Sequence, residues 1–187
     1  MHSSNYDLLL QKLDSFIRKY YKNQLLRGLI YSVGLLLLFY LTATTLEYFA
    51  HFNTVVRTVL FYTFLASSGY VLVKYIALPL AKLYKFGKII SYVDAAQIIG
   101  KHFGNVQDKL LNLLQLQQQM TEQSLQNQYA EYHKQYSLLE ASIHQKTTEL
   151  KPIPFSSAIN FGENKKYLKY ALLPTLVMVV LLFAAPS

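Results

Sequence analysis

The sequence predicts an all-α membrane protein with three transmembrane helices: a hairpin of two spans, a helical insert and a third span, after an amphipathic amino-terminal helix. The first observation is an uncharged apolar run at residues 28–46, bounded by Arg27 and Glu47. A spanning helix needs about 20 apolar residues, so this run is long enough to cross a bilayer. A second apolar run follows after a short gap, and a third closes the chain. The composition, 52% hydrophobic and 15% charged over 187 residues, fits a membrane protein with a polar insert.

Residues 1–25 are predicted to form the amphipathic helix. Ser4 and Asp7 have the spacing of a capping box. Apolar and aromatic side chains then recur at helical spacing and fall on one face: Tyr6, Leu9, Leu10, Leu13, Phe16, Ile17 and Tyr20. Two placements of this face are equally compatible with the pattern. The helix lies along the cytoplasmic leaflet before it turns into the membrane, or its apolar face packs on another protein helix.

Residues 26–81 are predicted to form the transmembrane hairpin. The first span covers about residues 26–48 and the second about residues 55–80, and the loop at residues 50–54 is too short to fold by itself. Arg57 has two options, to snorkel to the membrane surface or to pair with Glu47 across the mouth of the hairpin. Pro79 and the basic residues after it are expected to end the second span.

Residues 82–166 are predicted to form a helical insert that packs on itself close to the membrane. Ser91 and Asp94 are spaced as a capping box for one helix, which Gly104 ends. Asn105 opens a second helix, and the Gln-rich stretch at residues 115–128 fits either a continuation of that helix or a loose connection. A third helix is expected over residues 136–150, where the prolines of the KPIPF sequence stop it.

Residues 167–187 are predicted to form the third span, with Pro174 in its first turns, where the missing backbone donor is best tolerated. The chain stops where this span would leave the membrane. We therefore expect the span to lead into a periplasmic region beyond residue 187.

The positions of the basic residues predict the orientation. The net charge is +8, and of the 18 Lys and Arg residues five precede the first span, twelve lie from Lys74 onward, and Arg57 alone lies near the short loop. The positive-inside rule then places the amino terminus and the insert in the cytoplasm and the carboxyl end in the periplasm. Tyrosines stand near the predicted span ends, as is typical of membrane interfaces: Tyr31, Tyr48, Tyr75, Tyr84, Tyr167 and Tyr170.

The basic clusters that flank the spans are the candidate contact residues, for anionic lipid or for a protein or ribosomal partner. These residues are Lys12, Arg18, Lys19, Lys22, Lys82, Lys85 and Lys88.

The sequence lacks the patterns of the common catalytic and metal sites. It has no Cys, and its five His residues are not at the i, i+4 spacing of a helical zinc site. Gly100 and Lys101 lack the remaining residues of a phosphate-binding loop, and the spans carry no pair of acidic residues for a proton relay. We therefore expect neither an enzyme nor a secondary transporter, and no cofactor or metal.

Three stretches carry a resemblance to a known family: residues 94–117 with IIGKHF, residues 138–155 with KPIPF, and residues 165–187. Together they resemble the amino-terminal region of a Bacteroidota family of long inner-membrane proteins that carry a domain of unknown function. The resemblance implies a hairpin of spans, a cytoplasmic insert, a third span and a large periplasmic part. It also implies that this chain is a piece of a longer protein, and it supplies no functional residue.

These observations favour a non-enzymatic inner-membrane anchor or scaffold in a cell-envelope complex, with accessory work in protein export or translocation as one setting. Small residues in the spans (Gly28, Ser32 and Gly34; Ala66, Ser67, Ser68 and Gly69) allow close approach of helices, within the hairpin or to other membrane proteins. One alternative is a cytoplasmic-face module that binds the ribosome or an acidic protein. A channel or transport subunit is the third hypothesis, and the apolar spans disfavour it.

Overall fold

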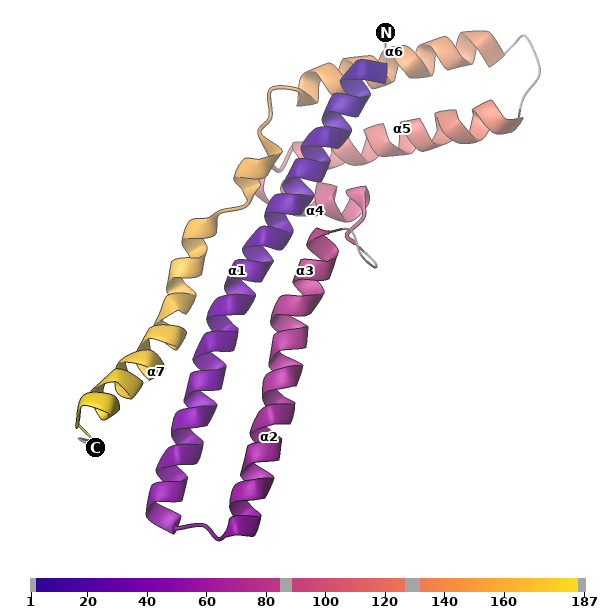
Figure 1. Cartoon of the computed structure of the whole chain (residues 1–187). Coiled ribbons are helices and arrows are strands. Elements are labelled where there is room, and N and C mark those ends of the chain that lie inside the picture. The colour runs from indigo at the N-terminus through magenta and orange to yellow at the C-terminus, as the bar shows by residue number, and fades with distance from the viewer. Residues whose placement is uncertain (1–2, 85–88, 127–131, 185–187) are drawn as a thin grey trace. The chain divides into compact units, whose positions relative to one another are not determined.

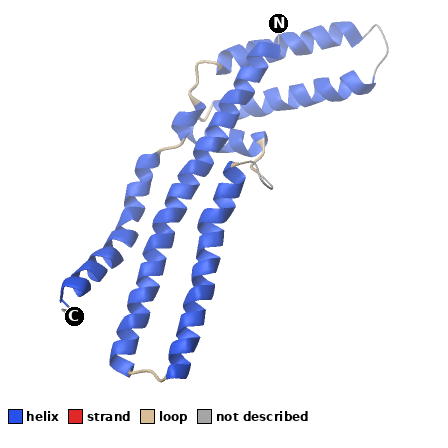
Figure 2. Ribbon diagram, viewed as in Figure 1, coloured by secondary structure: helices blue, strands red, loops and turns tan. Residues whose placement is uncertain are grey.

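The computed structural model describes residues 3–84, 89–126 and 132–184, and these residues form helices, turns and short connections without strands (Figures 1 and 2). This confirms the all-α class. Lys85 and Lys88, the side chain of Ser4 and the end of the chain lie outside the described positions. The elements in chain order are α1 (Ser3–Ala50), α2 (Thr54–Leu72), the π-helix η1 (Val73–Ala77), α3 (Leu78–Leu83), α4 (Tyr92–His102), α5 (Val106–Gln126), α6 (Tyr132–Leu150), the 3₁₀ turns η2 (Phe155–Ala158) and η3 (Phe161–Asn164), and α7 (Lys165–Ala184).

The chain divides into two packed units. The first, here called the helical unit, comprises Met1–Tyr20 and Ile89–Ile159; the second, the span unit, comprises Tyr21–Lys88 and Asn160–Ser187. The predicted insert was bounded at residues 82–166 and did not include the start of the chain. The first 20 residues of α1 belong with the insert because their apolar face is covered by its helices.

Three helical segments are long and apolar enough to cross a membrane: Tyr6–Ala50, Thr54–Leu83 and Phe155–Ala184. They contain the first two predicted spans and residues 167–184 of the third, whose last residues lie outside the described part of the chain. The first two form an antiparallel pair in which the Phe39 and Phe64 rings stack with centroids 5.5 Å apart. Glu47 and Arg57 form an ion pair of 2.7 Å beside the connecting loop, which is the second of the two options given for Arg57.

The second span continues past Pro79, contrary to the expectation that this residue helps to end it. One turn of π-helix, η1, separates α2 from α3, and the Leu78 N–H donates to the carbonyl of Val73. Pro79 thereby falls in the first turn of α3. A missing backbone donor is tolerated there, since first-turn N–H groups have no partner within their own helix. The helix runs on to Leu83.

Helix α1 is unbroken from Ser3 to Ala50, so the predicted turn between an amphipathic helix and the first span is absent. The sequence around residue 25 has no proline and a single glycine, Gly28, and so contains nothing that would stop a helix. The placement of residues 1–25 along a leaflet stays a prediction. Leu9, Leu13 and Phe16 are at most 2% exposed, which agrees with the second placement, packing against protein.

The helical unit has a hydrophobic core of its own. Helix α4 begins with the predicted capping box, in which the Asp94 N–H donates to Ser91 Oγ and the Ser91 N–H donates to Asp94 Oδ2, both at 3.1 Å. Helix α5 continues as a helix to Gln126 instead of loosening in its Gln-rich part. The core side chains come from α1, α4, α5, α6 and η2: Leu9, Leu13, Phe16, Ala95, Ala96, Ile99, Val106, Leu110, Leu113, Ile143, Leu150 and Phe155.

We expect the ion pair between α5 and α6 to make the helical unit slightly pH-sensitive. Lys109 Nζ donates to Glu149 Oε2 at 2.8 Å, and this hydrogen bond with the charge attraction lowers the pKa of Glu149 from its ordinary value of 4.5. The pKa of Glu149 is lower in the folded state than in the unfolded state. The ion pair therefore stabilises the fold above the unfolded-state pKa, and this stabilisation is lost as pH falls through the folded-state pKa. Thermal unfolding of the native chain and Glu149→Gln should differ near pH 7, and the difference should shrink as pH falls through the range in which Glu149 takes up its proton; a constant difference would contradict this.

Candidate functional site

Two glycines of α1 bring its backbone into direct contact with the backbones of two neighbouring helices of the span unit. A Cβ added at Gly28 would overlap the carbonyl oxygen of Tyr75 in η1, and one added at Gly34 would lie 2.5 Å from that of Tyr170 in α7. Approach this close requires residues without a side chain and allows Cα–H···O contacts between helices. Figure 1 shows α1 flanked by α7 and by the α2–α3 segment.

Both contacted carbonyls belong to a tyrosine that stands four residues before a proline. In an α-helix the carbonyl of residue i accepts from the N–H of residue i+4, and proline has no N–H. Pro79 and Pro174 therefore cannot supply the regular partners of the Tyr75 and Tyr170 carbonyls. Each of these oxygens faces a glycine of α1 instead.

The two contacted carbonyls lie in two similar short sequences, on helices that run in opposite directions along α1. Residues 74–79 read KYIALP and residues 169–174 read KYALLP, with identical residues at four of the six positions. The α2–α3 segment runs antiparallel to α1, whereas α7 runs parallel to it, because Asn164, Tyr167 and Tyr170 meet successively later residues of α1. The sequence analysis missed this repeat, although a comparison of the second and third spans would have found it.

Tyr31 fills the space between the two glycine contacts. Its ring centroid lies 5.2 Å from that of Tyr167 and 6.3 Å from those of Tyr75 and Tyr170. At about 100° per residue, position 31 points midway between the directions of positions 28 and 34. The four rings, called here the tyrosine cluster, thus join α1 to both partner helices, and each such ring pair contributes about 0.5–1.5 kcal/mol beyond its buried area.

Cations surround the tyrosine cluster. Lys74 Nζ lies 5.8 Å from the Tyr75 ring centroid, and Lys169 Nζ lies 5.3 Å from that of Tyr170. The Tyr167 ring has two cations, Arg27 and Lys166, at 5.3 and 5.2 Å. Aromatic rings and basic side chains of this kind are typical of the level at which helices leave the hydrocarbon for the headgroups.

Comparison of the chain with protein-family models, with curated proteins and with solved structures gives no match. The interpretation of the site therefore depends on its geometry.

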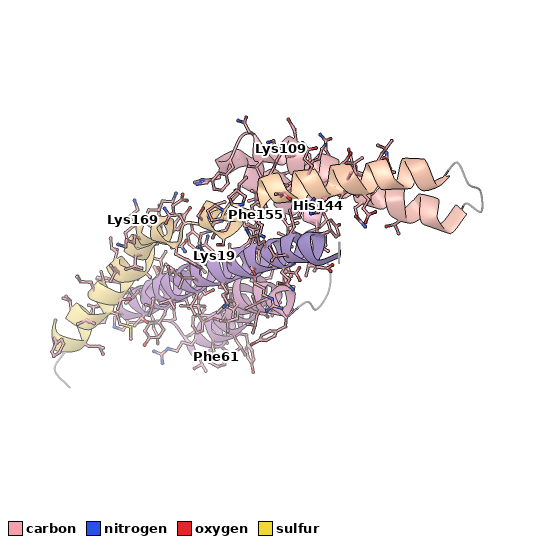
Figure 3. All side chains as sticks on the ribbon, turned by 90° about the horizontal axis from the view of Figure 1, so that it is seen from above. Lys19, Phe61, Lys109, His144, Phe155 and Lys169 are labelled. Carbon is pink, nitrogen blue, oxygen red and sulfur yellow. The ribbon has the colours of Figure 1, made fainter. Side chains whose placement is uncertain are left out.

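Two of the predicted contact lysines act inside the helical unit. Lys12 Nζ donates to the backbone carbonyls of Lys151 and Ile153, around the prolines of KPIPF, and lies 5.8 Å from the Phe155 ring centroid. Lys19 Nζ donates to the Ser156 carbonyl at 2.7 Å, beside Phe155 in Figure 3. These amines bind carbonyls of the segment in which α6 ends.

The other described residues of the predicted contact set lie on α1 and α3. Arg18 and Lys22 are exposed one turn apart on α1, and Lys82 is half-buried on α3. The prediction that they contact lipid or a partner is not tested by their positions, and Lys85 and Lys88 lie outside the described residues.

The described residues hold no group of three or more His, Asp or Glu side chains arranged to bind a metal ion. A polar contact in the helical unit involves a titratable side chain: the Tyr92 hydroxyl donates to Asp14 Oδ1 at 3.2 Å. Burial, followed by the nearby Asp14 carboxylate, raises the pKa of Tyr92. This hydrogen bond joins α1 to α4 within the helical unit.

Proposed function

We propose that this chain is a non-enzymatic membrane anchor and scaffold, in which three spans hold a separately packed helical unit at the cytoplasmic face of a bacterial inner membrane. The observation that carries the proposal is the division into two units with different surfaces. The span unit exposes large apolar side chains along its helices, whereas the helical unit buries its own core and exposes mainly polar positions. Such a unit is suited to binding a protein partner.

The packing of the span unit supports an anchor over a channel. Its helices are joined by glycine, tyrosine and proline contacts, which make a close-packed interface between backbones. Within the described residues, the buried side-chain oxygens without a hydrogen-bond partner are two serine hydroxyls, Ser32 Oγ and Ser68 Oγ. A conducting path needs a row of polar or charged groups, whereas the threonine hydroxyls of the spans, such as those of Thr42, Thr45 and Thr63, donate to carbonyls of their own helices.

The partner proposed is another protein of a cell-envelope complex, and protein export is the setting to examine first. The chain would be purified from its native membrane in mild detergent, and stoichiometric partners would be identified by mass spectrometry. We expect at least one partner whose recovery depends on a folded helical unit. Purification as a single 21.6-kDa species, without any stoichiometric partner, would overturn the scaffold proposal.

The orientation gives a separate prediction, which the absence of cysteine makes simple to test. Tyr48→Cys places a thiol at an exposed position near the hairpin loop, and Gln145→Cys places one at an exposed position of α6. A membrane-impermeant thiol reagent added to spheroplasts should label the first variant directly and the second after permeabilisation, because basic residues stay on the cytoplasmic side. The reverse pattern would refute the proposed orientation.

A further inference from the structure

We infer that Arg27, Lys166 and Tyr167 form a binding site for the phosphate of an anionic phospholipid. This inference rests on the proposed membrane anchoring and assigns a ligand to residues outside the predicted contact set. Arg27 Nη1 donates to the Tyr167 hydroxyl oxygen at 3.5 Å, and both Arg27 and Lys166 lie over the ring of Tyr167. Two cations 5.2–5.3 Å from the centroid of one ring make a local concentration of positive charge, which attracts an anion.

Neighbouring contacts hold the site between α1 and α7. On one side the Asn164 Nδ2 donates to Asn23 Oδ1 at 2.6 Å, with Asn164 3% exposed. On the other side Gly34 meets the Tyr170 carbonyl, and Tyr31 packs on Tyr167. The two helices are thus joined both before and after the cation pair. The cations themselves stay exposed to a ligand.

The span unit has too few carboxylates to pair with the cations near Arg27. Residues 21–88 and 160–187 contain ten Lys and Arg and two carboxylates, Glu47 and Glu163. Glu47 pairs with Arg57, and it stands 20 residues from Arg27 along α1, about 30 Å away at the rise of an α-helix. Glu163 reaches Lys166 only at 4.0 Å. In the described part of this unit, Arg27 therefore has an aromatic partner and no carboxylate partner.

The level of Arg27 and Lys166 along their helices indicates which ligand the site binds. Arg27 directly precedes the first apolar run, and Lys166 directly precedes the third, so both stand where a span enters the headgroup layer. Lys169, labelled on α7 in Figure 3, adds a further cation one turn along. Arginine binds phosphate oxygens through its planar donor group and lysine through a point charge. A lipid phosphate also places its acyl chains along the exposed apolar faces of α1 and α7.

The test uses the full chain reconstituted in vesicles of phosphatidylcholine and phosphatidylglycerol. It is then extracted in mild detergent, and the retained lipids are counted by native mass spectrometry. We expect the native chain to retain phosphatidylglycerol, and Arg27→Gln/Lys166→Gln to retain it roughly tenfold less. The matched control Lys101→Gln/Lys151→Gln removes the same charge from exposed positions of the helical unit, outside the predicted contact set, and should retain the lipid. Arg27→Lys/Lys166→Arg should retain most of it.

Three outcomes would overturn the inference. Equal losses in both double variants would mean that lipid responds to net charge alone, and unchanged retention in Arg27→Gln/Lys166→Gln would mean that these side chains do not bind it. Displacement of the lipid by inorganic phosphate would assign the site to the free anion. Recovery in the membrane fraction and thermal unfolding are measured for each variant. A chain that is membrane-bound and folded but has no lipid preference thus refutes the lipid site and leaves the anchor proposal standing.

Discussion

Gly28→Ala is expected to destabilise the span unit by about 1–3 kcal/mol, the usual cost of forcing an extra methyl group into a packed interface. The new Cβ would overlap the Tyr75 carbonyl oxygen. That oxygen is part of a backbone and cannot rotate away, so α1 and η1 must separate. Helix propensity alone predicts that Gly28→Ala stabilises the chain, because alanine is more favourable than glycine within a helix by about 1 kcal/mol. Unfolding of the purified chain in mixed detergent measures the difference.

Gly69→Ala is the matched control for this prediction. Gly69 lies within α2, and a Cβ built there meets nothing within 4 Å. Helix propensity then acts alone, and the control should be as stable as the native chain or more stable by up to about 1 kcal/mol. Equal effects of the two substitutions would show that Gly28 is not in close contact with η1. Gly34→Ala should behave as Gly28→Ala does and loosen α7 instead.

Phe155→Ala is expected to destabilise the helical unit by about 3–5 kcal/mol, the typical cost of truncating a buried phenylalanine. The ring is 1% exposed and lies in η2, just after the prolines that end α6. Its removal leaves a cavity in the core and takes away the ring beside the Lys12 amine. Limited proteolysis should then cut within residues 89–159 while the spans remain in the membrane fraction.

Leu138→Ala serves as the control in the same unit, because Leu138 is 63% exposed. Its proteolysis pattern should match that of the native chain, since surface substitutions change stability little. Comparable cutting in the two variants would contradict a core role for Phe155. Loss of the Phe155→Ala chain from the membrane fraction would contradict the independence of the span unit. The same pair of variants tests whether partner recovery needs a folded helical unit.

Local sequence signals predicted the features that depend on one element or on neighbouring residues. The three helices of span length follow from the length of the apolar runs, and the end of α6 follows from two prolines. The Glu47–Arg57 pair was one of two options that the tight hairpin left open. The Ser91–Asp94 capping box is likewise local. Each of these involves residues close together in the sequence or paired across one short loop, so no knowledge of tertiary packing was needed.

Features that depend on distant residues escaped prediction. Periodicity gave the apolar face of α1 but not what covers it, because a lipid surface and a protein helix select the same pattern. The contacts of Lys12 and Lys19 were missed because their acceptors are backbone carbonyls about 140 positions away. Such carbonyls carry no sequence signal. Prediction of the glycine contacts would have required the register of three helices. The repeated KY and LP pairs around residues 75 and 170 nevertheless mark two of these helices.

The placement of α1 between its two partner helices has a consequence for biogenesis. Gly28 can meet η1 as soon as the hairpin is made, but Gly34 must wait for Tyr170, which is translated 136 residues later. At synthesis rates of roughly 5–20 residues per second this interval is on the order of ten seconds. During that time the Gly34 face of α1 has no α7 beside it, so the three-helix packing is completed only after the last helix has been synthesised.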